Sequence, residues 1–483
     1  MDTLDYKHPD SLRIFFLTEM WERYGFYVVQ TLLVLYLTFH FHWGDERAFE
    51  LVGAYTALTY ISSLVGGWIA DQLLGQKTSI ILATIILIIS YSVLAWLQSA
   101  QGLLIALAGV CVGTGLLKPN ISSLLGNEYP LRSPRREVGF IIFYIGITAG
   151  IVLGSTLPNL FQQRFGWPIA FFSAAMGMVI ALFIFCYGIY RYKIVDYYTH
   201  VREPKKIAYT CLLILGLYFI ALEIFNNPNL GNTAFSGIVL FCVSYLIYAV
   251  RSAKGMQANQ NIIIALLCVI STLFWAFYFQ MFSSFALLIT RIVSPTLFGI
   301  SFPAPYYVAL QSFGLIIFGL LFSRPKHHAT ISIQAIHIGR KFLMAMMVMT
   351  LAYAFTTVIL HFNMSQTLLS PLLIIPLYLM ISAAELLLSP VGLAAITLLS
   401  SPNKVSTMMG IFFVTLGVGG FLSGKLASLA AVPSGTAPIE TLKLIYSVAF
   451  GKMLAILIIA TVLCFFVTLL IKYLLRDNPR KSS

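Results

Sequence analysis

The chain has 483 residues, of which 59% are hydrophobic and 10% are charged. Soluble proteins average roughly 45–50% apolar and about 25% charged residues, so this composition excludes a soluble enzyme, a secreted disulfide scaffold and a disordered chain. Lys and Arg outnumber Asp and Glu by 30 to 17, but the excess lies in short loops between apolar runs. That distribution favours membrane topology over a nucleic-acid partner. We therefore expect a polytopic protein of the lipid bilayer that binds no nucleic acid.

Apolar runs long enough to cross a bilayer recur along the whole chain. A membrane-spanning helix needs about 20 mostly apolar residues. Continuous runs of this kind favour helices over the short alternating strands of a membrane barrel. We predict fourteen spanning helices: 12–39, 48–73, 78–98, 101–125, 138–162, 167–191, 207–226, 232–250, 261–290, 305–323, 340–362, 368–399, 405–431 and 446–474.

The predicted helices fall into three parts. Residues 1–191 are expected to form one six-helix bundle, 192–260 a basic linker with two accessory helices, and 261–483 a second six-helix bundle with a tail. Two such halves are typical of transporters that bind substrate between them. The basic residues gather on one side of the predicted spans, which places both termini in the cytoplasm. The expected fold class is an all-α integral membrane protein.

Few ionisable residues lie inside the predicted spans, and such residues usually face a cavity or a partner. Glu19, Glu22 and Arg23 share one face of the first helix because they are spaced i, i+3 and i+4. One guanidinium cannot neutralise two carboxylates, so either a second cation joins them or a carboxylate binds a proton. Lys118, in the fourth helix, is the candidate second cation. A switchable carboxylate–lysine contact would explain proton coupling, and a static ion-pair cluster is the alternative.

Several motifs resemble those of the proton-dependent oligopeptide transporter family, within the major facilitator superfamily. The first helix reads EMWERYGFY from Glu19 to Tyr27, similar to the family pattern E-x-x-E-R-F-x-Y-Y. GGWIADQLLGQKT, GTGLLKPNISSLLG around Lys118 and AAELLLSPVGL around Glu385 also match in order. The resemblance implies the major facilitator fold with two extra central helices. It also implies transport driven by the proton gradient, with no cofactor and no enzymatic activity.

By this resemblance, the side of the substrate pocket that binds a peptide carboxylate is intact. Arg23, Tyr27 and Lys118 match positions that contact the C-terminal carboxylate or take part in proton movement. A guanidinium, a phenol and an ammonium together form a suitable anion site. Tyr60, in the second helix, matches a pocket tyrosine of the family, and simple packing is the alternative role.

The side that binds a peptide amine is depleted. Thr148 in FYIGITAG and Gly314 in LQSFGL stand where the family usually has amine-binding asparagines. Glu385 remains to pair with an ammonium, or else has a structural role between apolar helices.

A further departure from the family is paired. Phe279 in FWAFYFQ replaces a seventh-helix acid, and Gln30 replaces the first-helix arginine that usually pairs with it. Losing only the acid would leave a costly unpaired cation, so we interpret the site as neutralised and expect the gate to close through other contacts. Trp275 is kept and Phe412 replaces a pocket tryptophan. Each is expected to line the pocket or to fill the core.

We predict a monomeric, proton-coupled symporter that imports di- and tripeptides across a bacterial inner membrane. Proton coupling would depend on Glu19, Glu22, Arg23 and Lys118. A transporter of the same fold for another organic anion, a modified peptide or a metallophore is the alternative. A membrane-embedded enzyme or a sensor is a third possibility, but the eight histidines and six cysteines show no metal-ligand spacing and no catalytic set. No metal site is expected.

Overall fold

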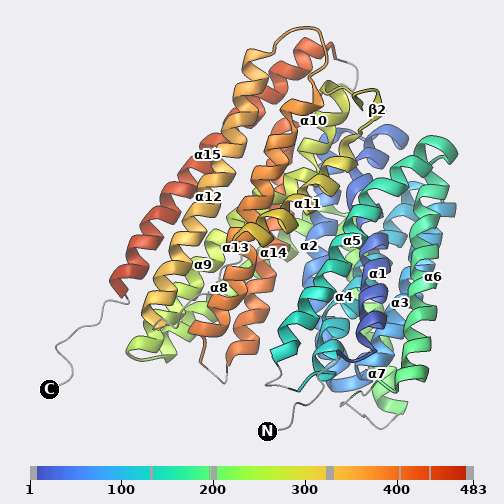
Figure 1. Ribbon diagram of the computed structural model, residues 1–483, viewed down its shortest axis with the longest axis vertical. Helices are drawn as coiled ribbons and strands as arrows, with labels where there is room; N and C mark the ends of the chain where they lie inside the picture. The colour runs from blue at the N-terminus through green and yellow to red at the C-terminus, as the bar shows by residue number, and fades with distance from the viewer. Residues whose placement is uncertain are drawn as a thin grey trace. The chain divides into compact units, whose positions relative to one another are not determined.

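The computed structural model describes residues 8–130, 134–194, 196, 204–322, 331–401, 404–433 and 437–474, and these residues are almost entirely helical (Figure 1). The first part of the chain contains α1 (Leu12–Leu35), η1 (Tyr36–His40), α2 (Asp45–Ile69), η2 (Ala70–Leu74), α3 (Gln76–Trp96), α4 (Ala100–Asn127), α5 (Pro134–Phe165), α6 (Trp167–Tyr192) and α7 (Pro204–Asn226). The rest contains α8 (Pro228–Ser252), α9 (Met256–Tyr278), η3 (Phe279–Phe282), α10 (Ser284–Ile292), β1 (Thr296–Leu297), β2 (Ile300–Ser301), α11 (Ala304–Phe322), α12 (Ile331–Phe362), η4 (Pro371–Leu373), α13 (Ile375–Leu399), α14 (Val405–Ala427), η6 (Ser428–Ala430) and α15 (Ile439–Leu474).

The helices match the predicted membrane spans. Within the described residues, 13 helical segments are long and apolar enough to cross a membrane, from α2 to α15. Helix α1 has 24 residues, also enough to span, but it differs from the other spans in carrying Glu19, Glu22 and Arg23 close together. With α1 included, the prediction of fourteen helices is confirmed. The cytoplasmic placement of the termini stays a prediction.

One predicted span is interrupted. The run 261–290 was expected to be a single helix, but α9 ends at Tyr278 and is followed by the 3₁₀ turn η3 and the short helix α10. Ser283 leaves the helical region, with φ −131° and ψ −97°. Gln280 stabilises the break, because its amide donates to the Ser423 carbonyl at 2.8 Å and its oxygen accepts from Ser284 Oγ at 2.6 Å. Composition could not predict this break, since the residues around it are apolar or small apart from Gln280.

The chain divides into two compact units. Unit 1 is Met1–His42 with Ala54–Leu230, and unit 2 is Trp43–Gly53 with Gly231–Ser483. Helix α2 therefore begins in unit 2 and continues in unit 1. Helix α7 packs on α4 within unit 1, and nearly all of α8 belongs to unit 2. The three-part division of the sequence, with 192–260 as a separate linker, stays a prediction.

In unit 1, glycines bring α1 and α5 together (Figure 1). Gly146, Gly150 and Gly154 recur every four residues on α5, so they lie along one face of the helix. A Cβ on Gly150 would overlap the Met20 carbonyl oxygen, and one on Gly154 would lie 2.6 Å from the Tyr24 carbonyl oxygen. Small residues of this kind allow close backbone approach between membrane helices. The stripe positions the middle of α1, where the charged residues lie.

A second glycine contact joins α2 to α4, also within unit 1. A Cβ on Gly66 would overlap the Gly115 carbonyl oxygen. Pro119 has no N–H, so it leaves this carbonyl without its usual helical donor. Ser62 Oγ adds a bond of 2.8 Å to the Cys111 carbonyl. This close crossing brings the Tyr60 region of α2 against Lys118 on α4.

Candidate functional site

The charged residues of α1 form a buried cluster in unit 1. Arg23 Nε lies 3.2 Å from Glu19 Oε1 and also donates to Glu22 Oε2. All three side chains are buried, with Glu22 fully inaccessible. The structure therefore confirms that the i, i+3, i+4 spacing places both carboxylates against one guanidinium.

The cluster is not fully satisfied. Among the described residues, Glu19 Oε2, Glu22 Oε1 and Arg23 Nη2 are buried without a hydrogen-bond partner. A buried polar atom without a partner is costly. A bound proton would convert one carboxylate oxygen into a donor, and an incoming anion would give the guanidinium nitrogen an acceptor.

Lys118 contacts an aromatic ring near the carboxylates. Its ammonium nitrogen is 4.3 Å from the centre of the Tyr60 ring, a cation–π contact. Among the described residues it makes no ion pair with Glu19 or Glu22. The structure thus brings Lys118 and Tyr60 together and leaves the ammonium free of a carboxylate partner.

The other two predicted residues of unit 1 occupy α1 and α5. Tyr27 is partly exposed one turn beyond Arg23, and its ring lies edge-on to Phe26. Thr148 is buried, and its hydroxyl donates to the Tyr144 carbonyl of its own helix at 3.1 Å. A threonine bonded in this way has no donor left for a ligand, whereas an asparagine would.

Unit 2 holds the second deep acid. Glu385 Oε2, on α13, accepts hydrogen bonds from the Tyr278 hydroxyl at 2.9 Å and from Gln311 Nε2 at 2.6 Å. These donors come from α9 and α11, so three helices meet at one carboxylate oxygen. Sequence reasoning missed Tyr278 and Gln311, although Gln311 lies only one turn before Gly314.

Gly314 has a packing role. A Cβ at this position would lie 2.7 Å from Ser382 Oγ and 3.0 Å from Leu379 Cδ2 of α13. Ser382 Oγ also donates to the Gln311 carbonyl at 2.7 Å. The close approach of α11 to α13 leaves no space for an asparagine side chain in this arrangement, and it brings Gln311 to Glu385. The assignment of Gly314 to the binding site stays a prediction.

Aromatic side chains surround the end of α9. Trp275 stacks on Phe279 with ring centres 5.6 Å apart and meets Tyr278 edge-on at 4.9 Å. Trp275 Nε1 is buried without a hydrogen-bond partner among the described residues. Phe412, on α14, is buried against Gly392 of α13. Trp275 and Phe279 thus adjoin Tyr278, which donates a hydrogen bond to Glu385, whereas Phe412 is part of the packed core.

The two neutralised positions are both buried. Gln30 donates from Nε2 to Thr56 Oγ1 at 3.2 Å within unit 1, and its Oε1 has no hydrogen-bond partner among the described residues. Phe279 is buried in the aromatic group of unit 2. Their interpretation as a neutralised gate stays a prediction.

Sequence reasoning also missed an ion pair at the start of α2. Arg291 makes a bidentate pair with Asp45, at 2.6 and 2.7 Å, and donates to the Tyr446 hydroxyl at 3.0 Å. Asp45 also accepts from the Val432 backbone N–H at 2.9 Å. Both charged side chains are buried, and all four residues belong to unit 2. Since Asp45 and Arg291 are 246 positions apart, no local pattern could have paired them.

The same end of α2 makes a second contact within unit 2. A Cβ on Gly424 of α14 would lie 2.6 Å from the Phe49 carbonyl oxygen, and Lys425 pairs with Glu50 at 2.6 Å. We call the residues Asp45, Glu50, Arg291, Lys425 and Tyr446 the α2 anchor. In the part of the chain that the structure describes, no group of three or more His, Cys, Asp and Glu residues could hold a metal ion.

The fold of this chain is similar to that of several solved peptide transporters. A structure described as showing substrate recognition in proton dependent oligopeptide transporters aligns with a TM-score of 0.82 at 24% identity, covering 96% of this chain and 99% of that one. A peptide transporter POT in complex with alafosfalin aligns with a TM-score of 0.84 at 23% identity, covering 98% and 97%. These similarities confirm the predicted major facilitator fold.

Curated relatives share the full length of the chain. A dipeptide and tripeptide permease B of Photorhabdus asymbiotica is 27% identical over 473 residues, which is 96% of each chain. A dipeptide and tripeptide permease A of Klebsiella pneumoniae is 28% identical, over 91% of this chain and 88% of its own.

The model of the POT family matches residues 77–448, well over half of the chain. This range includes Lys118, Glu385 and the aromatic group around Trp275. It leaves out the α1 cluster. The predicted resemblance is confirmed, and the chain belongs to the POT family.

Proposed function

We propose that this protein is a symporter that imports di- and tripeptides together with protons by alternating access. One observation supports this function above the others. Two buried carboxylates of α1 share one guanidinium, while Lys118 lies on the Tyr60 ring and pairs with no carboxylate in the described part of the chain. Membership of a transporter family excludes an enzyme as the main role, and the apolar helices together with the bacterial permeases identify a multi-pass inner membrane protein.

Charge balance in unit 1 couples protons to substrate. With both acids ionised, Glu19, Glu22, Arg23 and Lys118 sum to zero. A peptide carboxylate that binds Arg23 or Lys118 adds one negative charge, which is costly in a low-dielectric site. Protonation of Glu22 or Glu19 restores neutrality, so carboxylate binding and proton uptake favour each other. Loss of the proton to the cytoplasm would weaken the binding of the peptide carboxylate, release the peptide and complete the cycle.

In this proposal unit 1 binds the carboxylate end of the peptide. Arg23 Nη2 is buried without a hydrogen-bond partner among the described residues, the Lys118 ammonium carries three N–H donors, and Tyr27 and Tyr60 supply phenol groups. Charge-assisted bonds of this type are the stronger class of hydrogen bond.

Glu385, in unit 2, is the proposed partner for an ammonium. Tyr278 and Gln311 both bond to Glu385 Oε2, which leaves Oε1 to accept from an ammonium. Trp275 and Phe279 provide an apolar wall next to Tyr278 for the peptide side chains. In this proposal Gln311 compensates for the missing asparagines indirectly. It orients the Glu385 carboxylate, and that carboxylate contacts the amine.

The contact that replaces Phe279 and Gln30 in the gate stays a prediction. The Asp45–Arg291 pair of the α2 anchor lies within unit 2 and is a contact inside that unit.

A peptide-competition assay in proteoliposomes tests the proposed substrate class. With an inward proton gradient, labelled dialanine should accumulate above its outside concentration, and unlabelled trialanine should compete. Accumulation should stop when a protonophore is added. If neither peptide is transported or competes, the peptide assignment is wrong.

A second candidate is a proton-coupled transporter of a modified peptide, a metallophore or another organic anion. Two observations favour it: the Thr148 hydroxyl is already bonded, and no side chain fits at Gly314. The carboxylate side is complete, while the amine side depends on Glu385 alone. Competition by carboxylates that lack an amine, without competition by dialanine, would support this candidate.

A further inference from the structure

The two carboxylate oxygens of Glu22 have different surroundings. Oε2 accepts from Arg23 Nε, whereas Oε1 is buried without a hydrogen-bond partner among the described residues. The Glu22 side chain is fully buried, so bulk water does not reach Oε1. A buried carboxylate oxygen without a partner is costly. A partner for Oε1 therefore has to come from inside unit 1.

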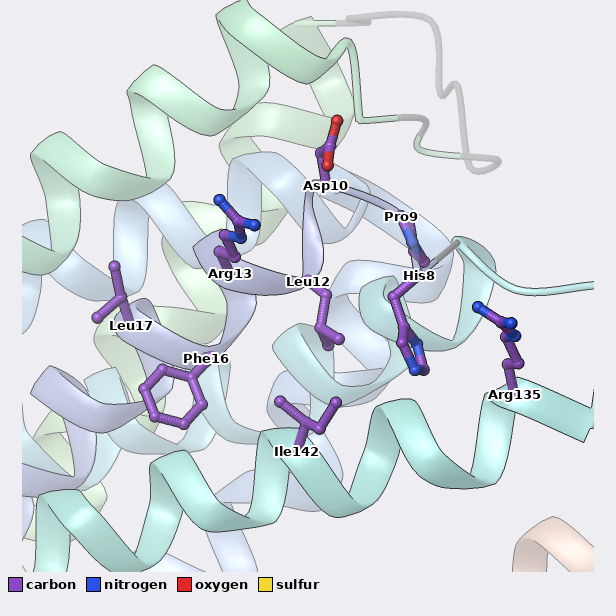
Figure 2. A pocket seen from close by; sticks show the side chains of 9 residues that line it. All are labelled: His8, Pro9, Asp10, Leu12, Arg13, Phe16, Leu17, Arg135 and Ile142. Carbon is purple, nitrogen blue, oxygen red and sulfur yellow. The ribbon is translucent and has the colours of Figure 1, made fainter. Parts of the chain in front are cut away.

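The pocket at the start of α1 does not supply that partner. It has a volume of about 720 Å³ and opens in unit 1 where α1 and α5 begin (Figure 2). The described residues of α1 that line it are Leu12, Arg13, Phe16 and Leu17. Leu17 precedes Glu22 by more than one helical turn. Solvent in this pocket therefore lies away from the Glu22 carboxylate.

Two tyrosine hydroxyls approach Glu22 from other helices of unit 1. Tyr91, on α3, packs against Gly25 of α1, where a Cβ would lie 3.0 Å from the ring atom Cε2 and 3.5 Å from the hydroxyl oxygen. Gly25 and Glu22 are spaced i, i+3, so they share one face of α1. Tyr55, on α2, interacts electrostatically with Glu22 and with Tyr91, and Tyr91 also interacts with Glu22. Both phenol groups are thus near the carboxylate.

These two hydroxyls also have no hydrogen-bond partner among the described residues. Both side chains are fully buried. Buried tyrosine hydroxyls usually find a partner. Glu22 Oε1 and the hydroxyls of Tyr55 and Tyr91 are near one another, yet no two of them bond directly. An ordered water that bonds to two or more buried polar groups resolves such an arrangement.

The positions of the two tyrosines do not depend on their hydroxyls. The Tyr55 carbonyl accepts from Thr59 Oγ1 at 2.7 Å and from Cys111 Sγ of α4 at 3.8 Å. Next to Tyr91, Ser90 of α3 packs on Gly109 of α4, where a Cβ would overlap the serine hydroxyl. Helices α2 and α3 are therefore both fixed on α4, and a phenylalanine at either tyrosine position should keep the place of the ring.

We propose that a bound water joins Glu22 Oε1 to the hydroxyls of Tyr55 and Tyr91, and that these tyrosines are positioning residues for proton uptake at Glu22. When Glu22 is ionised, the water donates to Oε1. When Oε1 binds a proton, it donates to the water, and the water donates to a tyrosine oxygen. Both states are satisfied, because water and hydroxyls can each donate and accept. The role in transport rests on the proposed function, whereas the water site does not.

Infrared difference spectroscopy of the full-length protein in lipid tests the water site. Spectra are recorded on acidification in ordinary water and in H₂¹⁸O, and the Glu22→Gln variant identifies the C=O band of protonated Glu22. The Tyr55→Phe/Tyr91→Phe variant should move this band to higher wavenumber, because the carboxyl group loses its hydrogen-bond network. The same variant should lose a water O–H band that shifts in H₂¹⁸O.

Tyr24→Phe is the matched control. Tyr24 is a buried tyrosine of α1, but its hydroxyl donates to Ser173 Oγ at 2.7 Å. Its loss should leave the Glu22 band and the water band unchanged. The water site is overturned if the double variant keeps both bands of the unchanged protein, if Tyr24→Phe moves them as much, or if Glu22→Gln removes no band.

Uptake by proteoliposomes tests the role in transport. The double variant should lower the rate of proton-driven dialanine uptake about tenfold, as for loss of one hydrogen bond to a charged group. Counterflow exchange of dialanine should keep its rate, since it needs no net proton movement. An unchanged rate of proton-driven uptake would overturn the positioning role. If the bands change as expected but even the unchanged protein transports no dialanine, the water site is supported and the proposed function is wrong.

Discussion

The two units use their buried acids in different ways. In unit 1, two carboxylates and two cations lie close together, and several of their polar atoms have no partner among the described residues. In unit 2, apart from the Asp45–Arg291 pair, the Glu385 carboxylate is oriented by two neutral donors, and the described residues that bond to it include no cation. A mixed-charge cluster can exchange protons and anions with little change in net charge. A single oriented carboxylate is suited to binding a cation, so we assign coupling to unit 1 and recognition of the ammonium to unit 2.

Removal of the proton site in unit 1 should have the largest effect. Glu22→Gln should abolish accumulation of dialanine above its outside concentration, because the glutamine cannot bind and release a proton. Counterflow exchange should persist, since it needs no net proton movement. Proteoliposome uptake with and without a gradient measures both.

Glu223→Gln is the control for this change, because Glu223 is an exposed acid of the accessory helix α7. It should accumulate dialanine normally. Normal accumulation by Glu22→Gln would instead assign the coupling role to Glu19, or to a residue of unit 2.

The strongest charge pair of unit 2 lies in the α2 anchor rather than at Glu385. Arg291→Gln should lower the free energy of unfolding by roughly 3–5 kcal/mol, because it leaves the Asp45 carboxylate buried without its cation. Thermal unfolding in detergent measures the loss. The Asp45→Asn/Arg291→Gln variant, which removes both charges, should recover much of it.

The exposed pair of the same anchor provides the comparison. Lys425→Gln breaks the bond to Glu50, but Lys425 is 40% exposed, so its loss should cost at most about 1 kcal/mol. Equal losses in the free energy of unfolding for Arg291→Gln and Lys425→Gln would show that burial does not make the Asp45–Arg291 pair more important than the Glu50–Lys425 pair.

Lys118 and the peptide carboxylate can be separated by the choice of substrate. Lys118→Ala should weaken dialanine binding roughly 10- to 100-fold, the range expected for a charged hydrogen bond. Dialanine amide, which has no free carboxylate, should bind the variant and the unchanged protein almost equally. Equal losses for the two ligands would contradict a contact between Lys118 and the carboxylate.

The smallest effects are expected at the donors to Glu385. Gln311→Leu should weaken the binding of dialanine about 2- to 10-fold, since it removes one hydrogen bond from a neutral donor to Glu385 and leaves the bond from Tyr278 in place. Glu385→Gln should weaken the binding of dialanine further, and neither change should alter the affinity for N-acetyl-dialanine. If N-acetyl-dialanine loses as much as dialanine, Glu385 acts through packing and not through the ammonium.

The sequence alone was sufficient to predict the class of protein, a polytopic membrane protein, and the number of its helices. It also indicated most of the acidic and basic residues of the candidate site. Bilayer thickness imposes a run length that hydropathy reveals directly. The i, i+3, i+4 spacing of Glu19, Glu22 and Arg23 is a local property of one helix, so it could be predicted without any knowledge of packing. The motifs around Lys118 and Glu385 indicated the family for the same reason, because each lies on one continuous segment.

Three-dimensional packing was needed for the partners of these residues. Tyr278 and Gln311 reach Glu385 from two other helices, Lys118 lies on Tyr60 because Gly66 and Gly115 allow α2 and α4 to touch, and Asp45 meets Arg291 across 246 positions. Such contacts depend on which helices adjoin and how closely their backbones approach. The hydrophobic pattern of the sequence gives information on neither of these. The buried charged residues could therefore be identified from the sequence, but their partners could not.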